Sequence, residues 1–498
     1  MALLLRSGQL LRGQPPALVA GDVLVDGERI AAVGAGVARP AGVEEIDATG
    51  CLVLPGLVNA HTHCHNNLLR GLAGRWTLED LLNHGPAMNA GRTPDDHYLS
   101  AAIGAVEMAK TGCTTAYDLF MSLPYPSLDE MEAVVRAYTD VGLRVVLAPA
   151  VADLRFWDTV PGLLDLLPSE LARHLEGLRP PSTGDLLRLG EDSIRKFHGA
   201  AGGRIRLALA PTIPTQCTDE FLEGCARQAR EHGLGLHTHL AESKVQAIAA
   251  LRRWGRTAVT RLSELGMLGP GFVGAHAVWL TDDDIARLGD AGAAISHNPA
   301  SNLRLGSGIA AVREMLDRGV TVALGCDGSM SSDNQNLFEA MRLAGLVGNV
   351  RFPHYTARWL DKADVWRMAT LNGARALGLD GQVGAIEPGR QADLVLLRAN
   401  TMYLTPRSDV LGSLIYVETG ASVDTVLVAG RVIVRRGRVL TVDEDNLRDR
   451  AQAAADRLRA RNASGFALAG SLAPYLADAC RTAAMTPYPV NRYAAPAG

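Results

Sequence analysis

Residues 51–63 read CLVLPGLVNAHTH, and this stretch decides the fold. It is a nearly unbroken apolar run that ends in two histidines, which is typical of a buried parallel strand with a polar carboxyl end. Because alternate side chains of a strand point to the same side, His61 and His63 face the same way. Two imidazoles that converge at a strand end can hold one metal ion, so we predict a metal site here.

The same pattern, an apolar run before a helix-like stretch, recurs along the middle of the chain. Eight such units predict an α/β fold, a (β/α)8 TIM barrel, which we place at residues 57–380. The runs are CLVLPGLVNAH (51–61), TTAYDL (114–119), RVVLAPAV (144–151), RIRLALAP (204–211), GLGLHTHL (233–240), GFVGAHA (271–277), AAISHNP (293–299) and VTVALGCD (320–327).

The two ends of the chain read as short strands separated by glycine and Asp-Gly turns. Near the start stands ALVAGDVLVDGERIAAVGAG (17–36), and near the end stand ADLVLLRA (392–399) and VDTVLVAGRVIVRRGRVL (423–440). Strands from opposite ends of a chain can pair in one small sheet. We therefore predict a discontinuous β-sandwich domain built from residues 1–56 and 381–441.

Two segments depart from this organisation. Residues 152–200 look like extra helices inserted after a barrel strand, and they can form either a lid over the site or a decoration of the surface. Residues 442–498 begin with a charged amphipathic helix, so we expect a C-terminal helical extension that packs on the surface or on a neighbouring subunit.

The composition limits the classes of partner. The formal net charge of −4 predicts no basic face, so nucleic acid is not an expected partner. No stretch approaches the ~20 apolar residues needed to span a membrane, and the first residues have no signal-peptide cleavage site. The seven cysteines are dispersed without a CxxC motif, as reduced thiols are. We expect a cytoplasmic protein that acts on a small molecule.

The stretch GLGLHTHLAES (233–243) supplies a second histidine pair. His237 and His239 share a face of the strand, and we expect one of them to join the metal site. Glu242 follows, where it can carry protons beside a metal-bound water, although glutamate is also favoured in the first turn of a helix.

Two further strand ends carry candidates for chemistry. GFVGAHAVWL (271–280) places His276 at the predicted barrel rim, and VTVALGCDGSMSSDNQN (320–336) places Asp327 at the end of the eighth strand. Asp327 can ligate the metal and take a proton from its bound water. Three histidines and one aspartate suit Zn²⁺, Fe²⁺ or Mn²⁺, so we expect one divalent metal ion, with zinc as the first choice.

A polar rim follows the seventh strand in AISHNPASNLRLGSG (294–308). Its side chains can contact a polar ligand, or they can serve as loop and helix caps. We take His297 and Asn302 as candidate substrate contacts.

Together these motifs resemble those of the amidohydrolase superfamily, in the same order and at barrel-like intervals. Within it, the chain is similar to the branch of cytosine-deaminase-like and s-triazine hydrolase enzymes, which includes methylthioadenosine/S-adenosylhomocysteine, guanine and oxopurine deaminases. The resemblance covers about residues 1–445 and rests on PGLVNAHTH (55–63), HTHLAES (237–243), GAHAVWL (274–280), SHNPASNLRLGSG (296–308) and GCDGSMSSDNQNLFEAMR (325–342).

The resemblance implies a mononuclear metal-dependent hydrolase that deaminates an aromatic N-heterocycle, a purine, pterin, pyrimidine or triazine, and releases ammonia. Chloride or an alkylamine is the alternative leaving group, and a homodimer or larger homo-oligomer is implied. The implied roles are metal ligation by His61, His63, His239 and Asp327, proton transfer by Glu242 and Asp327, and stabilisation of the developing charge by His276.

Three positions bear on the substrate. APTIP (210–214) has Thr212 where similar nucleoside deaminases carry a histidine, which disfavours a methylthioadenosine or S-adenosylhomocysteine substrate. Asn66 lies close to the position where some oxopurine and pterin deaminases carry a glutamine. Trp76 can stack on a ring from the loop after the first strand. We take Asn66, Trp76 and Thr212 as candidate substrate contacts.

Three alternatives are weaker. A binuclear cyclic amide hydrolase needs a bridging carboxylated lysine on a mid-barrel strand, and RIRLALAPTIP (204–214) has none, with Lys244 outside that strand. The small cytidine-deaminase fold needs a PCxxC motif, which the sequence lacks. A binding module without turnover has no need of both the ligands and the proton shuttle.

Overall fold

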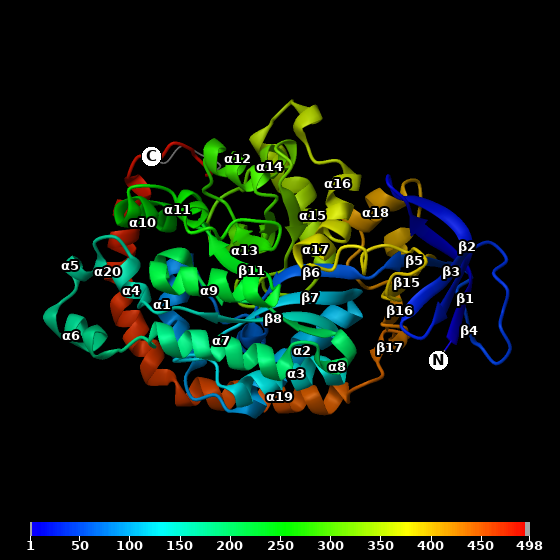
Figure 1. The fold of residues 1–498 in the computed structure, drawn as a ribbon, viewed down its shortest axis with the longest axis horizontal. Coiled ribbons are helices and arrows are strands. Elements are labelled where there is room, and N and C mark those ends of the chain that lie inside the picture. Colours follow the sequence, from blue (N-terminus) through cyan, green and yellow to red (C-terminus); the bar gives the residue numbers. More distant parts are fainter. Residues whose placement is uncertain (1, 494–498) are drawn as a thin grey trace.

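The structure is a computed structural model, and it describes residues 2–493 (Figure 1). Eight parallel strands form a TIM barrel, as the sequence predicts. Neighbouring strands pair in chain order, and single bridges from Thr62 to Asp327 and from Leu209 to Leu236 join the two halves. The strands are β6 (Leu57–Thr62), β7 (Cys113–Phe120), β8 (Arg144–Val151), the broken fourth strand β9 (Ile205–Leu207) and β10 (Ala210–Pro211), β11 (Leu236–Leu240), β12 (Phe272–His276), β13 (Ala294–His297) and β14 (Thr321–Leu324).

Helices cover the outside of the barrel, and their starts follow from local sequence. Thr93 and Thr281, for example, each accept a hydrogen bond from the third helical residue and form capping boxes with aspartates. Every residue of β7 and β8 is buried beneath these helices. The helices are α2 (Pro94–Lys110), α3 (Leu128–Val141), α7 (Thr183–Phe197), α8 (Ala200–Gly203), α9 (Asp219–His232), α10 (Lys244–Trp254), α11 (Ala258–Glu264), α12 (Asp282–Asp290), α13 (Pro299–Arg304), α14 (Val312–Asp317), α15 (Leu337–Val347), α16 (Lys362–Met368), α17 (Leu371–Ala376) and α18 (Val410–Tyr416).

The apolar run 51–61, expected as one barrel strand, is two strands that meet at Gly56. The first, β5 (Cys51–Pro55), pairs with strands of the small domain, and only β6 belongs to the barrel. A Cβ atom at residue 56 would lie 2.1 Å from Thr114 Oγ1, so this crossing between the two sheets requires glycine.

A nine-stranded sheet unites the two ends of the chain and forms the discontinuous β domain. Its strand order is β18-β17-β16-β15-β5-β1-β2-β3, with β4 beside β1. The domain boundaries at residues 56, 380 and 441 stay predictions. The remaining strands are β1 (Ala2–Arg12), β2 (Ala17–Asp26), β3 (Arg29–Gly34), β4 (Glu44–Asp47), β15 (Leu394–Arg398), β16 (Val423–Val428), β17 (Arg431–Arg435) and β18 (Arg438–Val439).

Additional helices lie on and beside the carboxyl end of the barrel. The long C-terminal helices α19 (Glu444–Arg461) and α20 (Ala463–Met485) run along the molecule, and α20 packs against α1 (Leu78–Asn89) (Figure 1). The end of the predicted extension, residues 494–498, lies outside the described residues. The insertion supplies α4 (Phe156–Thr159), α5 (Leu163–Leu166) and α6 (Ser169–Gly177), and short 3₁₀ helices are η1 (Cys64–Leu69), η2 (Pro214–Gln216), η3 (Gly348–Arg351), η4 (Thr356–Arg358) and η5 (Met402–Leu404).

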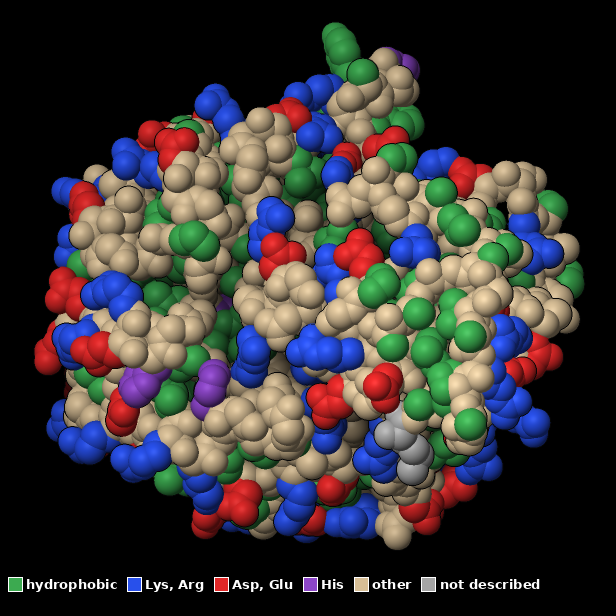
Figure 2. Space-filling model, turned by 45° about the vertical axis from the view of Figure 1, so that its right-hand side comes forward, with side chains coloured by type: hydrophobic (Ala, Val, Ile, Leu, Met, Phe, Trp, Pro, Cys, Tyr) green, Lys and Arg blue, Asp and Glu red, His purple; other side chains and the backbone are tan. Residues whose placement is uncertain are grey.

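The surface carries both signs of charge. On the face shown in Figure 2, basic and acidic side chains are interspersed, in keeping with the small net charge. Within residues 2–493, every helix is too short or too polar to cross a membrane.

Candidate active site

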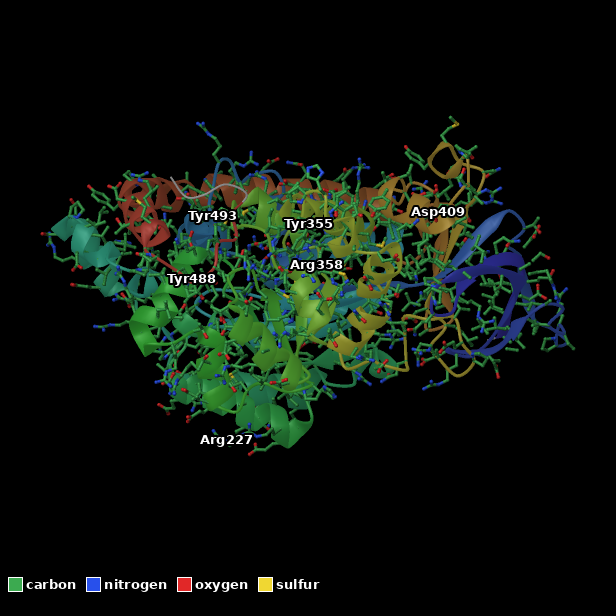
Figure 3. All side chains as sticks on the ribbon, turned by 90° about the horizontal axis from the view of Figure 1, so that it is seen from above. Arg227, Tyr355, Arg358, Asp409, Tyr488 and Tyr493 are labelled. Atoms are coloured by element: carbon green, nitrogen blue, oxygen red, sulfur yellow. The ribbon has the colours of Figure 1, made fainter. Side chains whose placement is uncertain are left out.

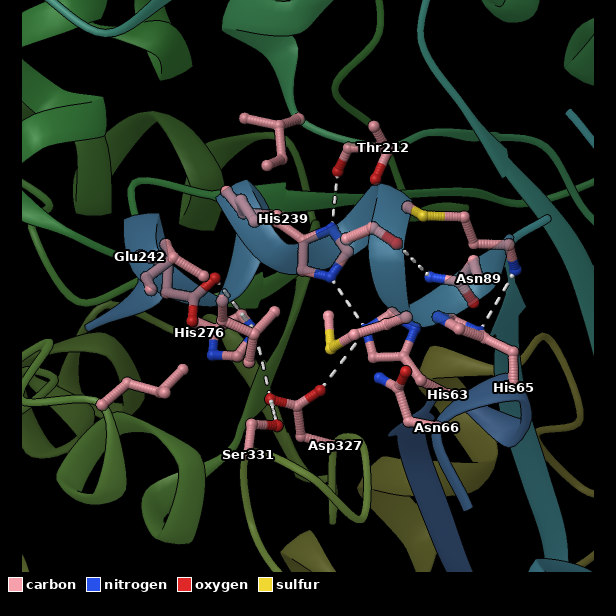
Figure 4. Close-up of a pocket in the computed structure, with 18 residues that line it drawn as sticks. His63, His65, Asn66, Asn89, Thr212, His239, Glu242, His276, Asp327 and Ser331 are labelled. Atoms are coloured by element: carbon pink, nitrogen blue, oxygen red, sulfur yellow. Dashed lines mark hydrogen bonds and ion pairs between the residues drawn. The ribbon is translucent and has the colours of Figure 1, made fainter. Parts of the chain in front are cut away.

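The carboxyl ends of four barrel strands bring five buried titratable side chains together, of which Figure 4 labels His63, His239, His276 and Asp327. In a parallel barrel all strand ends of one polarity lie on one face, which is why residues far apart in sequence meet here. The side chains are His61 and His63 from β6, His239 from β11, His276 from β12 and Asp327 from the turn after β14.

Two of these histidines present unprotonated nitrogens to each other. His63 Nδ1 lies 2.8 Å from the Leu119 carbonyl and His239 Nδ1 lies 2.6 Å from the Thr212 carbonyl, so each ring carries its proton on Nδ1. The two Nε2 atoms then face each other as lone pairs at 3.1 Å. Such a contact is repulsive without a cation, and the donor set therefore fits a bound metal ion.

His61 and Asp327 complete a compact ligand set around this pair. Asp327 Oδ1 lies 3.5 Å from His61 Nε2 and 3.3 Å from His63 Nε2. His61 Nε2 is buried without a hydrogen-bond partner, and its Nδ1 lies 3.2 Å from His237 Nε2. Groups of ligand atoms here lie within 4.8 Å of one another, close enough to share one ion.

The surroundings of Asp327 keep it ionised and fixed. Although burial raises its pKa, the neighbouring histidines, His61 first among them, lower that pKa well below the usual range. The Gly328 N–H donates to Oδ1 at 2.7 Å and Ser331 Oγ donates to Oδ2 at 2.9 Å. Asp327 and His276 both have a positive φ, 62° and 68°, and such backbone strain is common at functional sites.

Glu242 has the opposite character. Its carboxyl is buried, and burial, together with the charges of Asp327 and Glu79, raises its pKa well above the usual range. Glu242 Oε2 lies 3.5 Å from His276 Nε2. His276 Nδ1 lies 2.9 Å from Asn302 Oδ1 and donates its proton there, which leaves its Nε2 turned towards the carboxylates. Two carboxyls near one histidine whose pKa values are shifted in opposite directions are typical of an acid–base pair.

These groups meet at one cavity at the carboxyl end of the barrel. Among the predicted residues, His63, His239, Glu242, His276 and Asp327 line it, and so do the predicted substrate contacts Asn66 and Thr212. His61 does not line the cavity and belongs to the candidate metal-ligand groups.

Three predicted substrate contacts lie elsewhere among the described residues. Trp76 stacks on His84, with ring centroids 4.2 Å apart, and does not line the cavity. His297 is buried behind the site, and neither of its ring nitrogens has a hydrogen-bond partner. Asn302 contacts His276 and not the cavity. No side chain of the insertion at 152–200 lines this cavity.

The structure adds residues that the sequence interpretation missed. His65 lines the cavity, two positions beyond His63, and its Nδ1 accepts a hydrogen bond from the Met121 N–H at 3.2 Å. One wall comes from α1, including Leu82, Met88 and Asn89. The continuing alternation HTHCH was a signal for His65. Nothing in the local sequence indicated that Leu82, Met88 and Asn89 of α1 face the candidate metal ligands.

Curated relatives match most of the chain in sequence. The 5'-deoxyadenosine deaminase of Methanothermobacter thermautotrophicus is 37% identical over 439 residues, 88% of this chain and 95% of the relative. The 5-methylthioadenosine/S-adenosylhomocysteine deaminase of Moorella thermoacetica is 35% identical over 436 residues, 87% of this chain and 94% of the relative.

Solved structures of two zinc-bound enzymes have a fold similar to that of this chain. The atrazine chlorohydrolase of Arthrobacter aurescens, in complex with zinc, matches with a TM-score of 0.82 and 28% identity, covering 91% of this chain and 100% of that one. An adenosine deaminase of Xanthomonas campestris with bound zinc matches with a TM-score of 0.81 and 26% identity, covering 92% and 98%. The sequence profile described as the Amidohydrolase family matches residues 52–433. This chain belongs to the amidohydrolase family.

Proposed function

We propose that this amidohydrolase is a mononuclear metal-dependent deaminase that releases ammonia from an amino-substituted aromatic N-heterocycle. The observation that carries the proposal is the pair of buried carboxyls in the cavity: Glu242 Oε2 lies 3.5 Å and Asp327 Oδ2 lies 3.9 Å from His276 Nε2, and the pKa is lowered in Asp327 and raised in Glu242. Deamination needs a base for the attacking water and an acid for the ring nitrogen, and this pair supplies both.

We assign the metal to His61, His63, His239 and Asp327. The facing lone pairs of His63 and His239 support this assignment, as do the solved relatives with bound zinc. When bound there, a divalent ion lowers the pKa of water towards ~7 and makes hydroxide available at neutral pH. We propose Zn²⁺, with Fe²⁺ and Mn²⁺ as alternatives.

The protein groups divide the proton transfers. Asp327 Oδ2 accepts the proton of the attacking water and returns it to the amino group as the carbon–nitrogen bond breaks and ammonia leaves. The Ser331 hydroxyl holds this carboxylate in place. Glu242 gives its proton to the ring nitrogen beside the reacting carbon. His276 Nε2 lies next to both carboxyls and stabilises the developing charge once this nitrogen is protonated. Asn302 acts through His276 by fixing the tautomer of its ring.

We assign direct substrate contact to Asn66 and Thr212, which line the cavity. An amide and a hydroxyl can each donate and accept, which suits the mixed edge of a nitrogen heterocycle.

A second candidate is an s-triazine-type hydrolase that releases chloride or an alkylamine. It is supported by the likeness to the chlorohydrolase structure. The same base and acid would serve, because the ring carbon is attacked in the same manner and only the leaving group differs. A binuclear cyclic amide hydrolase gains no support, since Lys244 begins α10 and donates to the Ala484 carbonyl.

We also propose a cytoplasmic location and a homodimeric or larger assembly. Seven cysteines without a disulfide support a reducing compartment. Interspersed surface charge supports a small molecule, rather than nucleic acid, as the partner.

The test is a leaving-group screen on the zinc-loaded protein. Adenine nucleosides, guanine, oxopurines, pterins, cytosine and aminotriazines are assayed for ammonia, and halogenated and alkylaminotriazines for chloride and amine. Ammonia release that is lost in Glu242→Gln supports the deaminase. Chloride or amine release without ammonia favours the second candidate, and silence in all three assays with metal bound contradicts both.

A further inference from the structure

Helix α1 forms one wall of the catalytic cavity, and this wall carries no charge. Its lining residues are apolar apart from one glycine and one amide: Leu78, Leu81, Leu82, Gly85, Met88 and Asn89. Met121, Ile213 and Leu305 extend the apolar lining. No lysine or arginine lines the cavity, and its carboxylates are those of Glu242 and Asp327.

Asn89 is the polar exception, and half of its amide is free. Its Nδ2 donates to the Gly85 carbonyl at 3.0 Å, whereas its Oδ1 is buried without a hydrogen-bond partner. The side chain as a whole is 4% exposed and lines the cavity (Figure 4). Because the amide nitrogen is committed to a carbonyl, the atom left for a ligand is an acceptor.

We propose that α1 selects substrates whose ring carries an uncharged substituent with a hydrogen-bond donor and an apolar end. The donor binds Asn89 Oδ1, and the apolar end packs on Leu82 and Met88. This inference rests on the proposed function and narrows its substrate class. A 5'-deoxy sugar, with hydroxyls and a methyl end, has this chemistry, and so does an alkylamino group on a triazine.

A substituent with a carboxylate or phosphate would lose its hydration on this wall and find no cation in return. A second cavity adjoins the first and shares Leu78 and Leu305 with it, but its charged groups already have partners. Asp80 caps α1, Arg481 pairs with Asp478, Lys244 binds the Ala484 carbonyl and Glu79 accepts from Ser243. A charged tail that reached this space would meet Lys244 already bound to a carbonyl and Arg481 already paired at the surface.

The experiment measures binding by calorimetry to zinc-loaded Glu242→Gln, so that turnover does not interfere. In each of two ligand pairs the charged member carries a carboxylate that the neutral member lacks: 5'-deoxyadenosine against adenosine 5'-carboxylate, and an alkylaminotriazine against its carboxyalkylamino analogue. We expect the neutral member of at least one pair to bind at least about tenfold more tightly. Equal binding of charged and neutral members, or no binding by any of the four, overturns the inference.

The role of Asn89 is tested separately. Asn89→Leu should weaken the preferred neutral ligand by about tenfold, through loss of the hydrogen bond to its donor. The matched ligand without that donor, a fully deoxygenated sugar or a dialkylated amine, should bind both proteins alike. Equal weakening of both ligands would mean a merely structural role. If the binding preference holds while the wild type releases no ammonia, the deaminase proposal fails and the selectivity survives.

Discussion

At the scale of single residues, the strongest consequence concerns the proton held by Glu242. Glu242→Gln preserves shape but removes the acid, so kcat should fall by about 10²–10⁴-fold while metal content stays the same. Because burial raises the pKa of Glu242, the wild type should lose activity on the alkaline side as this proton dissociates. The measurement is kcat/KM against pH in both proteins. An alkaline limb that persists unchanged in the variant would contradict the assigned role.

The metal ligands make a second prediction at this scale. His61→Ala should lose bound zinc, because it removes one of the buried nitrogens of the cluster. His65→Ala is the matched control, since His65 lines the same cavity but belongs to neither ligand group. Zinc content by elemental analysis should drop in the first variant only. Added zinc should raise the melting temperature of the wild type and of His65→Ala, but not of His61→Ala. Equal zinc in both variants would refute the assignment of His61.

At the scale of elements, the contact between α20 and α1 supports the cavity wall from behind. Gly465 faces Ala87 so closely that a Cβ atom would lie 3.1 Å from the Ala87 Cβ, whereas Gly470 has open space around it. Gly470→Ala should stabilise the helix by about 0.5–1 kcal/mol, because alanine has the higher helix propensity. Gly465→Ala should not gain this stability, because the added methyl group overpacks against Ala87. It should also raise KM by displacing α1. Melting temperature and KM of the two variants decide the matter, and equal shifts in both would leave α20 without this role.

The strands of the site could be predicted from the sequence, whereas the helix that forms its wall could not. Strand ends carrying His61, His239 and Asp327 were predictable, because an apolar run fixes the strand and parallel pairing fixes the shared face. The wall from α1 was not, since the orientation of this helix depends on α20 at the other end of the chain. Asn83 Nδ2, for example, donates to the Ala469 carbonyl at 2.8 Å across 386 positions of sequence. Trp76 stays a predicted substrate contact, and the structure places its ring on His84; only the packing decides whether a loop tryptophan stacks on a ligand or on a neighbouring side chain.

At the scale of the whole molecule, the last segment of the chain closes on the loops that carry the chemistry. Tyr488 donates to the Trp279 carbonyl at 3.1 Å, and the ring of Tyr493 lies 4.8 Å from that of Trp279. Figure 3 labels the two tyrosines. Trp279 lies three residues beyond His276 in the loop after β12. These contacts hold the loop from a segment beyond residues 52–433, the part matched by the family profile.

The barrel and the β domain are joined by a buried ion pair that no local pattern could predict. Arg144 of β8 contacts Asp393, just before β15, at 3.2 Å, and Asp393 also accepts from the Ala429 N–H at 2.7 Å. Arg144→Met would leave the Asp393 carboxylate buried without a cation, at a cost of about 3–5 kcal/mol. The double variant with Asp393→Leu should recover much of this loss, because the uncompensated charge is gone.

Unfolding in denaturant measures both variants against a matched exposed pair. Arg188→Met breaks the contact with Asp185, in which both side chains are exposed. It should lower the free energy of unfolding by less than about 1 kcal/mol. If Arg144→Met costs no more than this surface change, the buried pair does not hold the two parts of the molecule together. If the double variant is as unstable as Arg144→Met alone, the loss of stability comes from lost packing and not from the unpaired carboxylate. The barrel and the β domain would then be held together by packing rather than by the ion pair.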